Sequence, residues 1–467
     1  MGQIELNIPS CAFFPAASNP ATAQVTHGTN FSIWENSFAD AASTYANLHL
    51  MIPINHTAGS NYVGNTFWRS SATSGDVVWA TYTDLNQNTT TVSPGQGSEI
   101  NTVSASTDNL DAGTATNSVA TTTADRLAWL GQFRQGAAAG DTMTASARSV
   151  GTTYTVAWDN SVNGVELLVP AHAMALGGSS GATYTSVYAT TRTCRSVTVG
   201  EGDYAEFAFT LPSNYTGNLA FSLWVNPLDT GTTTWTWDTC YVALGETWDG
   251  TYTTGSEFTI TGGSATTFYE DKQRAANSGA AAGDTVKVRL TRTSTGTSTA
   301  EALILTAGVT YNVGSNKSCI RFSPQSFVQP SSSPASPSMI DGSNSSFFGI
   351  VFSNGSTTQA DMCIPVPTKY LAGATMRVRW FSPSTGSLQM KALYSNVADD
   401  GSLDPTLTDP GTTTKASSGA GKLNESTFTV AMTAGNVFLL RLQRQSGDSI
   451  ADDVTVVDCF IETIAGV

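Results

Sequence analysis

Histidine is the commonest metal ligand in proteins, and the histidines of this sequence are clustered. All four lie in the first 172 residues, and His27, His49 and His56 fall within 30 residues of one another. His49 and His56 are seven residues apart with a proline between them, which fits neither a helical zinc motif nor a zinc finger. We therefore expect no metal site at the histidines.

A second group of candidate ligands is the stretch ADDGSLDPTLTDPG, which contains Asp399, Asp400, Asp404 and Asp409. Carboxylate oxygens are the ligands that calcium prefers, but the stretch lacks the glutamate that closes an EF-hand loop. Aspartate before glycine or proline is also common in ordinary turns. The sequence favours a turn here and leaves bound calcium as an open alternative.

Two tryptophans in TTTWTWDTC have the spacing of a sugar-binding surface. Trp235 and Trp237 are two residues apart, so both would project from one face of a strand, where indole rings can stack on sugars. When the chain is aligned with itself, Trp237 matches Trp79 and nearly matches Met390, which predicts a core position for Trp237. Trp235 has no such counterpart, so we take it as the candidate contact for a glycan or a protein partner.

The heptapeptide GAAAGDT occurs at 136–142 and again at 279–285. A loop of small residues can hold a phosphate where a helix follows and points its amides at the ligand. A segment with strand-like alternation follows here, so the heptapeptide is predicted to be a structural turn. The chain also shows no nucleophile elbow, no Cys/His pairing and no matched pair of carboxylates. These patterns predict a protein that is not an enzyme and binds no cofactor.

The heptapeptide belongs to a longer internal repeat, which sets the architecture that would position any site. AGDTVKVRLTR is followed later in the chain by a degenerate copy, AGNVFLLRLQR. In each copy a proline turn after an apolar segment lies upstream. The glycines that anchor the three copies are Gly140, Gly283 and Gly435, and the prolines are Pro53, Pro212 and Pro367.

These anchors divide the chain into three copies at 1–173, 174–316 and 317–467. Short alternating strands between Gly, Asn, Ser and Pro turns are typical of an antiparallel β-sandwich, and the length of each copy favours a jelly roll. We predict an all-β chain of three tandem jelly-roll-like sandwiches. The extra length of the first copy is assigned to a long polar loop near 86–110, and the stretch 121–134 is interpreted as strand rather than helix.

Composition limits the partners. Charged residues make up 12% of the chain and the net charge is −15, so the protein would repel nucleic acid and anionic lipid. The first residues, MGQIELNIPSCAFFPAAS, lack the basic region of a secretory signal, and apolar runs are too short to span a bilayer. We expect synthesis in the cytosol without membrane insertion. The six cysteines, which lack CxxC spacing, are expected to be buried, with a disulfide left open.

The third copy resembles the jelly-roll modules of accessory virion proteins of tailed phages, found in capsid decorations, head fibres and tail appendages. The resemblance rests on a Gly-Ser-Asn segment, a VPxxY segment and an A-G-[DN] strand that ends in arginine. The residues concerned are Gly342, Ser343, Asn344, Val366, Pro367, Tyr370, Arg292 and Arg444. In the first copy the match is looser, since His56 replaces the tyrosine and Arg148 comes one residue early.

This resemblance implies a non-enzymatic structural or interaction protein of a bacteriophage particle, located in the virion. Its partners would be other virion proteins and further copies of itself, with a trimer as the first expectation. The alternative is a carbohydrate-binding adhesin that recognises cell-surface glycans, with Trp235 and the 86–110 loop as its first candidate contacts.

Overall fold

The computed structural model describes residues 2–465 with internal gaps, and shows 3-10 turns but no α-helix in that part of the chain. The residues outside the description are 1, 16–19, 41, 52–60, 86–94, 103–106, 121–126, 159–163, 179–180, 188–193, 263–268, 277–278, 315–316, 369 and 466–467. The 3-10 turns are η1 (Ser10–Ala12), η2 (Ala171–Ala173) and η3 (Pro324–Ser326).

The strands before residue 159 form two antiparallel sheets. The large sheet has the order β3 (Thr22–His27), β4 (Ser32–Phe38), β11 (Ala147–Trp158), β6 (Asn61–Ser70) and β9 (Asp111–Ala120), with β1 (Gly2–Pro9) also paired to β11. The small sheet has the order β2 (Phe14–Pro15), β5 (Ser43–Met51), β10 (Leu127–Gln135), β7 (Asp76–Leu85) and β8 (Gly95–Thr102).

The next strands repeat this arrangement. The large sheet is β14 (Thr183–Val187), β15 (Cys194–Val199), β22 (Ala302–Val313), β17 (Tyr215–Asn226) and β20 (Tyr269–Ala275), with β12 (Gly164–Pro170) on β22. The small sheet is β13 (Ala175–Gly178), β16 (Asp203–Thr210), β21 (Thr285–Thr293), β18 (Thr232–Val242) and β19 (Phe258–Thr261). Because β12 pairs with β22, the second pair of sheets begins before the expected boundary at residue 174.

The last strands repeat it again. The large sheet is β24 (Ser336–Asp341), β25 (Ser346–Phe352), β32 (Val454–Ala465), β27 (Tyr370–Phe381) and β30 (Asn424–Val430), with β23 (Lys317–Phe322) on β32. The small sheet is β26 (Thr358–Pro365), β31 (Val437–Arg444), β28 (Ser387–Val397) and β29 (Thr413–Ala416). In each pair the chain alternates between the sheets as in a jelly roll, which confirms the predicted all-β sandwich fold.

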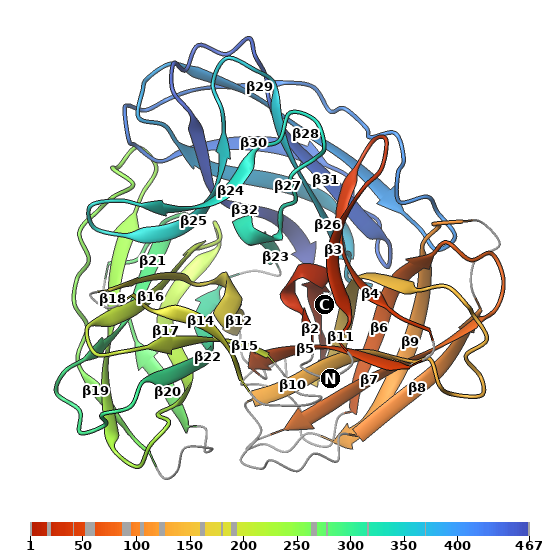
Figure 1. Cartoon of the computed structure of the whole chain (residues 1–467). Coiled ribbons are helices and arrows are strands. Elements are labelled where there is room, and N and C mark those ends of the chain that lie inside the picture. The colour runs from red at the N-terminus through yellow and green to blue at the C-terminus, as the bar shows by residue number, and fades with distance from the viewer. Residues whose placement is uncertain are drawn as a thin grey trace.

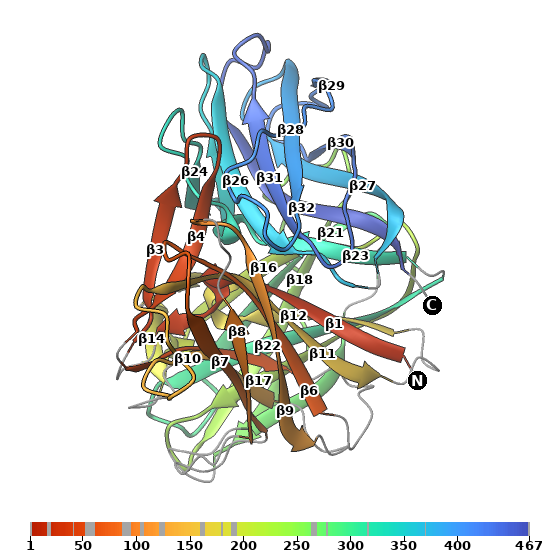
Figure 2. The same cartoon turned by 90° about the vertical axis from the view of Figure 1, so that its right-hand side faces the viewer.

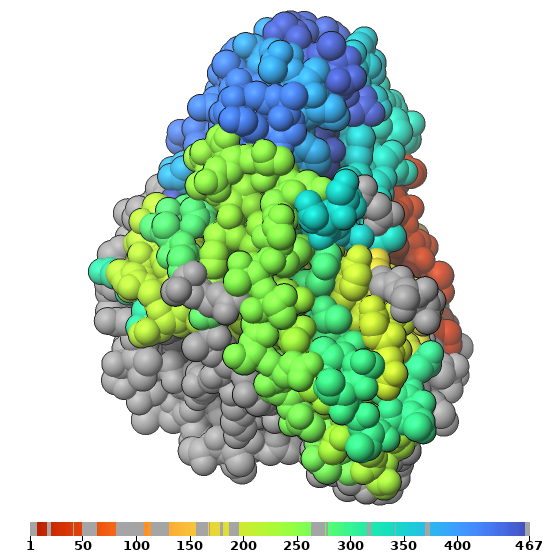
Figure 3. All heavy atoms as spheres, turned by 90° about the vertical axis from the view of Figure 1, so that its left-hand side faces the viewer, coloured from red at the N-terminus to blue at the C-terminus, as the bar shows by residue number. Residues whose placement is uncertain are grey.

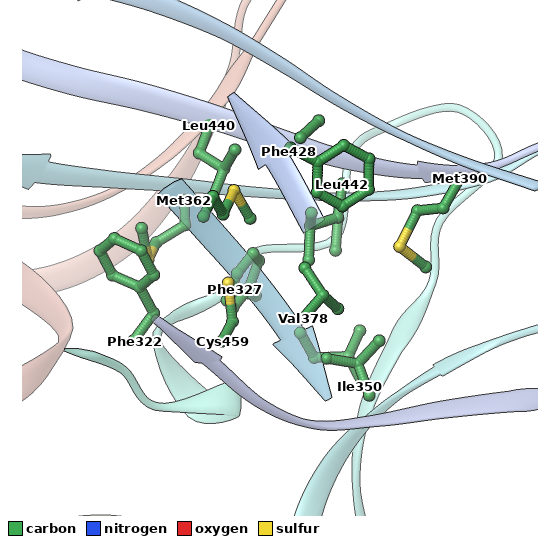
Figure 4. Close-up of a cluster of buried hydrophobic side chains, with 14 of the residues drawn as sticks. Phe322, Phe327, Ile350, Met362, Val378, Met390, Phe428, Leu440, Leu442 and Cys459 are labelled. Atoms are coloured by element: carbon green, nitrogen blue, oxygen red, sulfur yellow. The ribbon is translucent and has the colours of Figure 1, made fainter. Parts of the chain in front are cut away.

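Apolar side chains that alternate along the strands fill the space between the two sheets of each sandwich. In β30 the pattern of burial is strictly alternating, as expected for a strand with one face on a core. The core of the third sandwich draws residues from both of its sheets (Figure 4). Its labelled members are Phe322, Phe327, Ile350, Met362, Val378, Met390, Phe428, Leu440, Leu442 and Cys459.

A buried arginine lies at or next to the end of β10, β21 and β31, which are equivalent strands of the three small sheets. These arginines show which residues of the three jelly rolls are equivalent. Arg134, Arg292 and Arg444 are 0%, 2% and 1% exposed, and each donates to carbonyl oxygens of the connection that leads into the last strand. Arg134 and Arg444 also pair with an aspartate of that connection. Arg134, not Arg148 of β11, is therefore the counterpart of the other two arginines.

The repeated heptapeptide does not occupy equivalent places, so the sequence alignment of the first copy was wrong. Gly283 and Gly435 precede β21 and β31, with φ of +85° and +76°, whereas Gly140 follows β10. The residue before the upstream proline of the same copy, Leu211 or Val366, exchanges backbone hydrogen bonds with the glycine turn of its own sandwich. Identical small-residue sequences form turns at both places because turn chemistry is local.

Strand β8 lies inside the predicted polar loop at 86–110, and pairs along its whole length with β7. The sequence of β8 has no apolar alternation, since an edge strand can be held by backbone hydrogen bonds alone. The stretch at 121–134 contains β10, as interpreted from the sequence, and 86–94 and 121–126 lie outside the described residues.

The three jelly rolls form a ring in which each small sheet packs on the large sheet of a neighbour (Figure 1). The small sheet of the second roll contacts β25 and β32 of the third, the small sheet of the third contacts β1, β4 and β11 of the first, and β5 of the first contacts β12, β15 and β22 of the second. Figure 3 shows the second and third rolls, green to blue, packed together on one side. Both termini lie on one side of the ring, and strands β3, β14 and β24 lie on the other (Figure 2).

Candidate functional site: the junctions between the jelly rolls

An aspartate of the third jelly roll holds a turn of the first. The Asp404 carboxylate accepts hydrogen bonds from the backbone amides of Thr29, Asn30 and Phe31, at 2.7, 2.6 and 2.8 Å. The Asn30 side-chain amide donates to the Asp404 carbonyl oxygen at 3.1 Å. These bonds fix the turn between β3 and β4 to the connection between β28 and β29. We call this arrangement the 3–1 clamp.

The same arrangement joins the second jelly roll to the third. Asp249 accepts from the backbone amides of Ser343 and Asn344 at 2.8 and 3.1 Å, and from the Ser345 hydroxyl at 3.1 Å. The Asn344 side-chain amide donates to the Asp249 carbonyl oxygen at 2.9 Å. This 2–3 clamp fixes the turn between β24 and β25. The two clamps are therefore equivalent in place and share the aspartate and the asparagine, and they differ in the third donor, which is the Phe31 amide in one and the Ser345 hydroxyl in the other.

A buried ion pair lies beside each clamp. Asp361 accepts two hydrogen bonds from Arg441, each at 2.6 Å, and a third from the backbone amide of Ser32 of the first roll at 2.8 Å. Burial raises the pKa of Asp361, and the hydrogen bonds and charge of Arg441 oppose that rise. The pair thus links β26 and β31 to the start of β4.

In the 2–3 junction the equivalent pair is Glu206 with Arg289, joined at 2.6 Å, and Glu206 also accepts from the backbone amide of Ser346. The Arg289 guanidinium makes cation–π contacts with the rings of Tyr204 and Tyr252, at 4.1 and 4.4 Å from their centroids. Burial raises the pKa of Glu206, and the Arg289 charge opposes that rise. Both junctions therefore use an acid, an arginine and a serine amide.

Apolar residues fill the two junctions differently. In the 2–3 junction Trp248 contacts Phe347 edge to face at 4.9 Å and stacks on Phe381 at 6.0 Å. The 3–1 junction instead contains mainly aliphatic side chains, with Leu403 at the position of Trp248. Its buried members are Phe31, Ile33, Phe67, Leu110, Val150, Cys363, Val397, Leu403, Val437 and Leu439.

A buried lysine distinguishes the 2–3 junction. Lys287 is 1% exposed and its ammonium donates to the Trp248 carbonyl oxygen at 3.1 Å and to the Ser345 hydroxyl at 2.6 Å. Burial lowers the pKa of Lys287 below 10.5. The equivalent residue of the 3–1 junction is the buried Leu439.

The anchors found in the sequence also take part in a junction. The Gly283 carbonyl oxygen accepts from Arg379 of the third roll at 3.0 Å, and the amide of Ser213, next to Pro212, donates to Glu462 at 3.0 Å. Pro367 lies just after β26, which packs on the first roll, and Pro53 lies outside the described residues. The turns at Pro212 and Gly283 are therefore part of the 2–3 junction.

Trp235 is not at the surface, so its assignment as a glycan or partner contact was wrong. Its side chain is 0% exposed, packs in the core of the second roll and donates to the Thr233 hydroxyl at 2.9 Å. Trp235 lies opposite Arg292 as Trp79 lies opposite Arg134, so Trp235, and not Trp237, is the counterpart of Trp79. Counting residues from the anchor prolines had misplaced this match by two residues, because the loops that follow the prolines differ in length.

The acidic stretch serves the junction, which the sequence did not show. Asp404 makes the 3–1 clamp, and Asp409 pairs with Lys391 at 2.6 Å, which lowers the pKa of Asp409. Among the described residues no group of three or more potential ligands could hold a metal ion. The His27 ring bonds the Ser32 hydroxyl at 2.9 Å. Of the cysteines described, Cys11, Cys240, Cys319, Cys363 and Cys459 are free.

Nothing local in the sequence marks a clamp, because its two halves lie far apart in the chain. Gly-x-Asn at Gly28 and at Gly342 lies in both clamped turns, but the same pattern also occurs at 59–61 and 314–316, so it does not single them out. No helix in the described part of the chain is long and apolar enough to cross a membrane.

Comparisons with known proteins show no family. No family model and no curated protein sequence matches the chain. Similar solved structures include the N-terminal CBM22-1–CBM22-2 tandem domain of Paenibacillus barcinonensis Xyn10C, at 11% identity and TM-score 0.24, with 66% of this chain and 100% of that chain covered.

The tandem CBM51 modules of Sp3GH98, the family 98 glycoside hydrolase of Streptococcus pneumoniae SP3-BS71, show 9% identity and TM-score 0.17, with 59% and 84% covered. A Paenibacillus xanthan lyase shows 11% identity and TM-score 0.20, with 96% of this chain and 35% of that chain covered. At these scores the likenesses carry no argument about function.

Proposed function

We propose that this chain is a non-enzymatic structural and interaction protein of a bacteriophage particle, as a capsid decoration or as part of a head or tail appendage. The observation that carries the proposal is the closed ring of three jelly rolls, in which each small sheet packs on the next large sheet. Head-to-tail interfaces of this kind close into rings when the rotation between units fits. Here the three units of the ring belong to one chain.

A body with approximate three-fold symmetry suits a three-fold position on a particle. Each of its three units can present a related surface to one of three identical partner subunits. A single copy would then occupy such a position, and the expected homo-oligomer, with a trimer first, stays a prediction for solution measurements.

The positions of several charged side chains support a structural role. Asp361, Glu206, Arg289 and Arg441 are engaged in junctions between jelly rolls, where they are held by ion pairs and backbone amides. A catalytic carboxylate needs a substrate-facing position and a pKa matched to its task. Groups fixed between domains serve geometry instead.

The proposal is tested on particles. An antibody raised against the recombinant chain is applied to phage particles purified from the source culture, and labelling is imaged by negative stain. Labels at regular positions on capsid, neck or tail are the expected result. Particles without label, together with mass spectra of the particles that lack peptides of this chain, would reject the proposal.

The carbohydrate-binding alternative is measured in parallel on a glycan array. Of the tryptophan side chains that the structure describes, all but Trp34 are buried, which leaves few indole faces for sugars. A virion structural protein is expected to give no selective hit. A selective, concentration-dependent hit from the same preparation would favour the adhesin.

A further inference from the structure

We infer that the core of the first jelly roll binds buried water, which bridges polar side chains that the other two cores lack. The inference starts from Gln132 of β10, which is 0% exposed and lies two residues from the core residue Leu130, on the same face of the strand. Within the described part of the chain, neither its amide nitrogen nor its amide oxygen has a hydrogen-bond partner. Buried polar groups are nearly always paired, with protein groups or with water.

Two tryptophans of the same core also have unpaired donors. The indole nitrogens of Trp68 and Trp79 are buried and have no hydrogen-bond partner among the described residues. Their rings lie 5.9 Å apart, with Trp68 on the large sheet and Trp79 on the small sheet. Trp79 lies opposite Arg134, two residues along β10 from Gln132. The unpaired groups therefore lie on both walls of one core.

The equivalent tryptophans of the other rolls are paired. The strand register matches the two indoles of the first roll with Trp380 and Trp235. Trp380 donates to the Ser426 hydroxyl at 3.0 Å, and Trp235 donates to the Thr233 hydroxyl at 2.9 Å. In the first roll the residues at the places of these two hydroxyls are Gly113 and Val77. The indoles of the first roll thus need another acceptor.

Unpaired polar groups also lie on the large sheet. The Asn36 side-chain nitrogen donates to the Ser10 carbonyl oxygen at 2.8 Å, but the Asn36 side-chain oxygen and the buried Thr152 hydroxyl have no partner within the described residues. The other cores are apolar at the positions of Asn36, Gln132 and Thr152. The residues there are Val197, Leu290 and Ala307 in the second roll and Ile350, Leu442 and Cys459 in the third.

Small polar side chains replace branched apolar ones beside these groups. Ser149 and Thr66 are the buried residues concerned, and their counterparts are Ile304 and Leu223 in the second roll and Val456 and Val378 in the third. Tyr154 reaches across the core, and its hydroxyl donates to the Gly131 carbonyl oxygen at 3.3 Å, next to Gln132. A buried water requires such a polar site bounded by side chains that leave it room.

The mixture of unpaired atoms identifies the ligand as water. The indole nitrogens donate, the Asn36 oxygen accepts, and the Gln132 amide and the Thr152 hydroxyl can do both. A bound ion would require atoms of one kind, and the charge of Arg134 in this core is already paired with Asp141. Water is neutral, donates and accepts, and typically makes about three hydrogen bonds when buried.

A crystal structure of the full chain at a resolution that shows ordered water tests this directly. We expect density for at least one water at about 2.7–3.2 Å from the Gln132 amide and from a second of the unpaired atoms. The other two cores are internal controls in the same map, and no water is expected beside Leu290 or Leu442. A first core as free of water as the other two would overturn the inference.

The variant Gln132→Leu copies the residue of the other two cores and should lose this water. Gln389→Leu, at a partly exposed glutamine of β28, is the matched control and should keep it. A water that stays in place in Gln132→Leu would overturn its assignment to the polar side chains. Asn36→Val copies Val197 and repeats the test from β4, so that one variant that does not fold leaves the test intact.

Discussion

The 2–3 and 3–1 junctions use the same polar parts to join quite different stretches of chain. The first joins domains that follow one another, and the second joins the two ends of the chain, yet each has a clamping aspartate and an acid–arginine pair. The apolar filling differs, with aromatic rings around Trp248 in one and mainly aliphatic side chains in the other. The polar parts thus fix how two jelly rolls meet, while packing is free to vary.

The largest expected difference between the junctions concerns this filling. Trp248→Ala should cost about 4 kcal/mol of unfolding free energy and Leu403→Ala about 3 kcal/mol, because the larger side chain leaves the larger cavity. Urea unfolding of the full chain measures both. Leu244→Ala, at a half-exposed leucine of the same connection as Trp248, is the control and should change little. A larger loss at Leu403 would show that the aromatic filling is not the stronger one.

The ion pairs should rank next. Arg441→Met leaves Asp361 buried without its partner and should cost about 3 kcal/mol, and Arg289→Met should cost about 2 kcal/mol because Glu206 receives one bond from its arginine rather than two. The double variant Asp361→Leu/Arg441→Met removes both charges and should recover most of the loss. If the double variant does not recover this loss, the pair contributes more to stability than the cost of burying its two charges.

The clamps should contribute less, and equally. Asp404→Ala and Asp249→Ala should each cost about 1 kcal/mol, since both carboxylates accept hydrogen bonds at partly exposed turns. Thermal unfolding of the two variants is compared with Asp452→Ala, an exposed aspartate outside both clamps. Unequal losses at the two clamps would contradict their equivalence.

The smallest expected effect is a dependence of the free energy of unfolding on pH, which only the 2–3 junction should show because it contains Lys287. Since burial lowers the pKa of Lys287, the unfolded chain binds more protons than the folded chain at pH values just below 10.5. The free energy of unfolding should therefore rise with pH through that window, and the gain is complete above the unfolded pKa. Lys287→Leu copies Leu439 and should flatten this slope. Urea titrations at about pH 8 and about pH 10 compare the two chains, and parallel slopes would contradict the assignment.

The fold was predictable because its signals are local. Alternation after Gly283 and Gly435 marked β21 and β31, and turn residues marked the strand ends. The identical heptapeptide misled, since Gly140 lies in a different turn. Counting from the anchor prolines misled as well, and hid Trp79 as the true counterpart of Trp235. Identical residues in the sequence are a weaker guide to equivalent positions than the order and register of the strands, which only the structure supplies.

The junctions were not predictable because they depend on distant contacts. Asp404 and Asn30 are 374 residues apart, and nothing next to either residue indicates the other. Asp404 has the sequence setting of an ordinary turn aspartate, and Glu206 that of an isolated acid in a strand. Their roles follow from how three sandwiches pack, which composition and periodicity do not encode.

The placement of the chain ends on one side of the ring has a practical consequence for imaging (Figure 2). A fluorescent or gold-binding tag fused beyond β1 or beyond β32 would mark the same side of the molecule. On a decorated particle, density for the tag would then show whether that side faces the shell or the solvent. The two fusions should give the same answer, so each serves as an independent check on the orientation of the other.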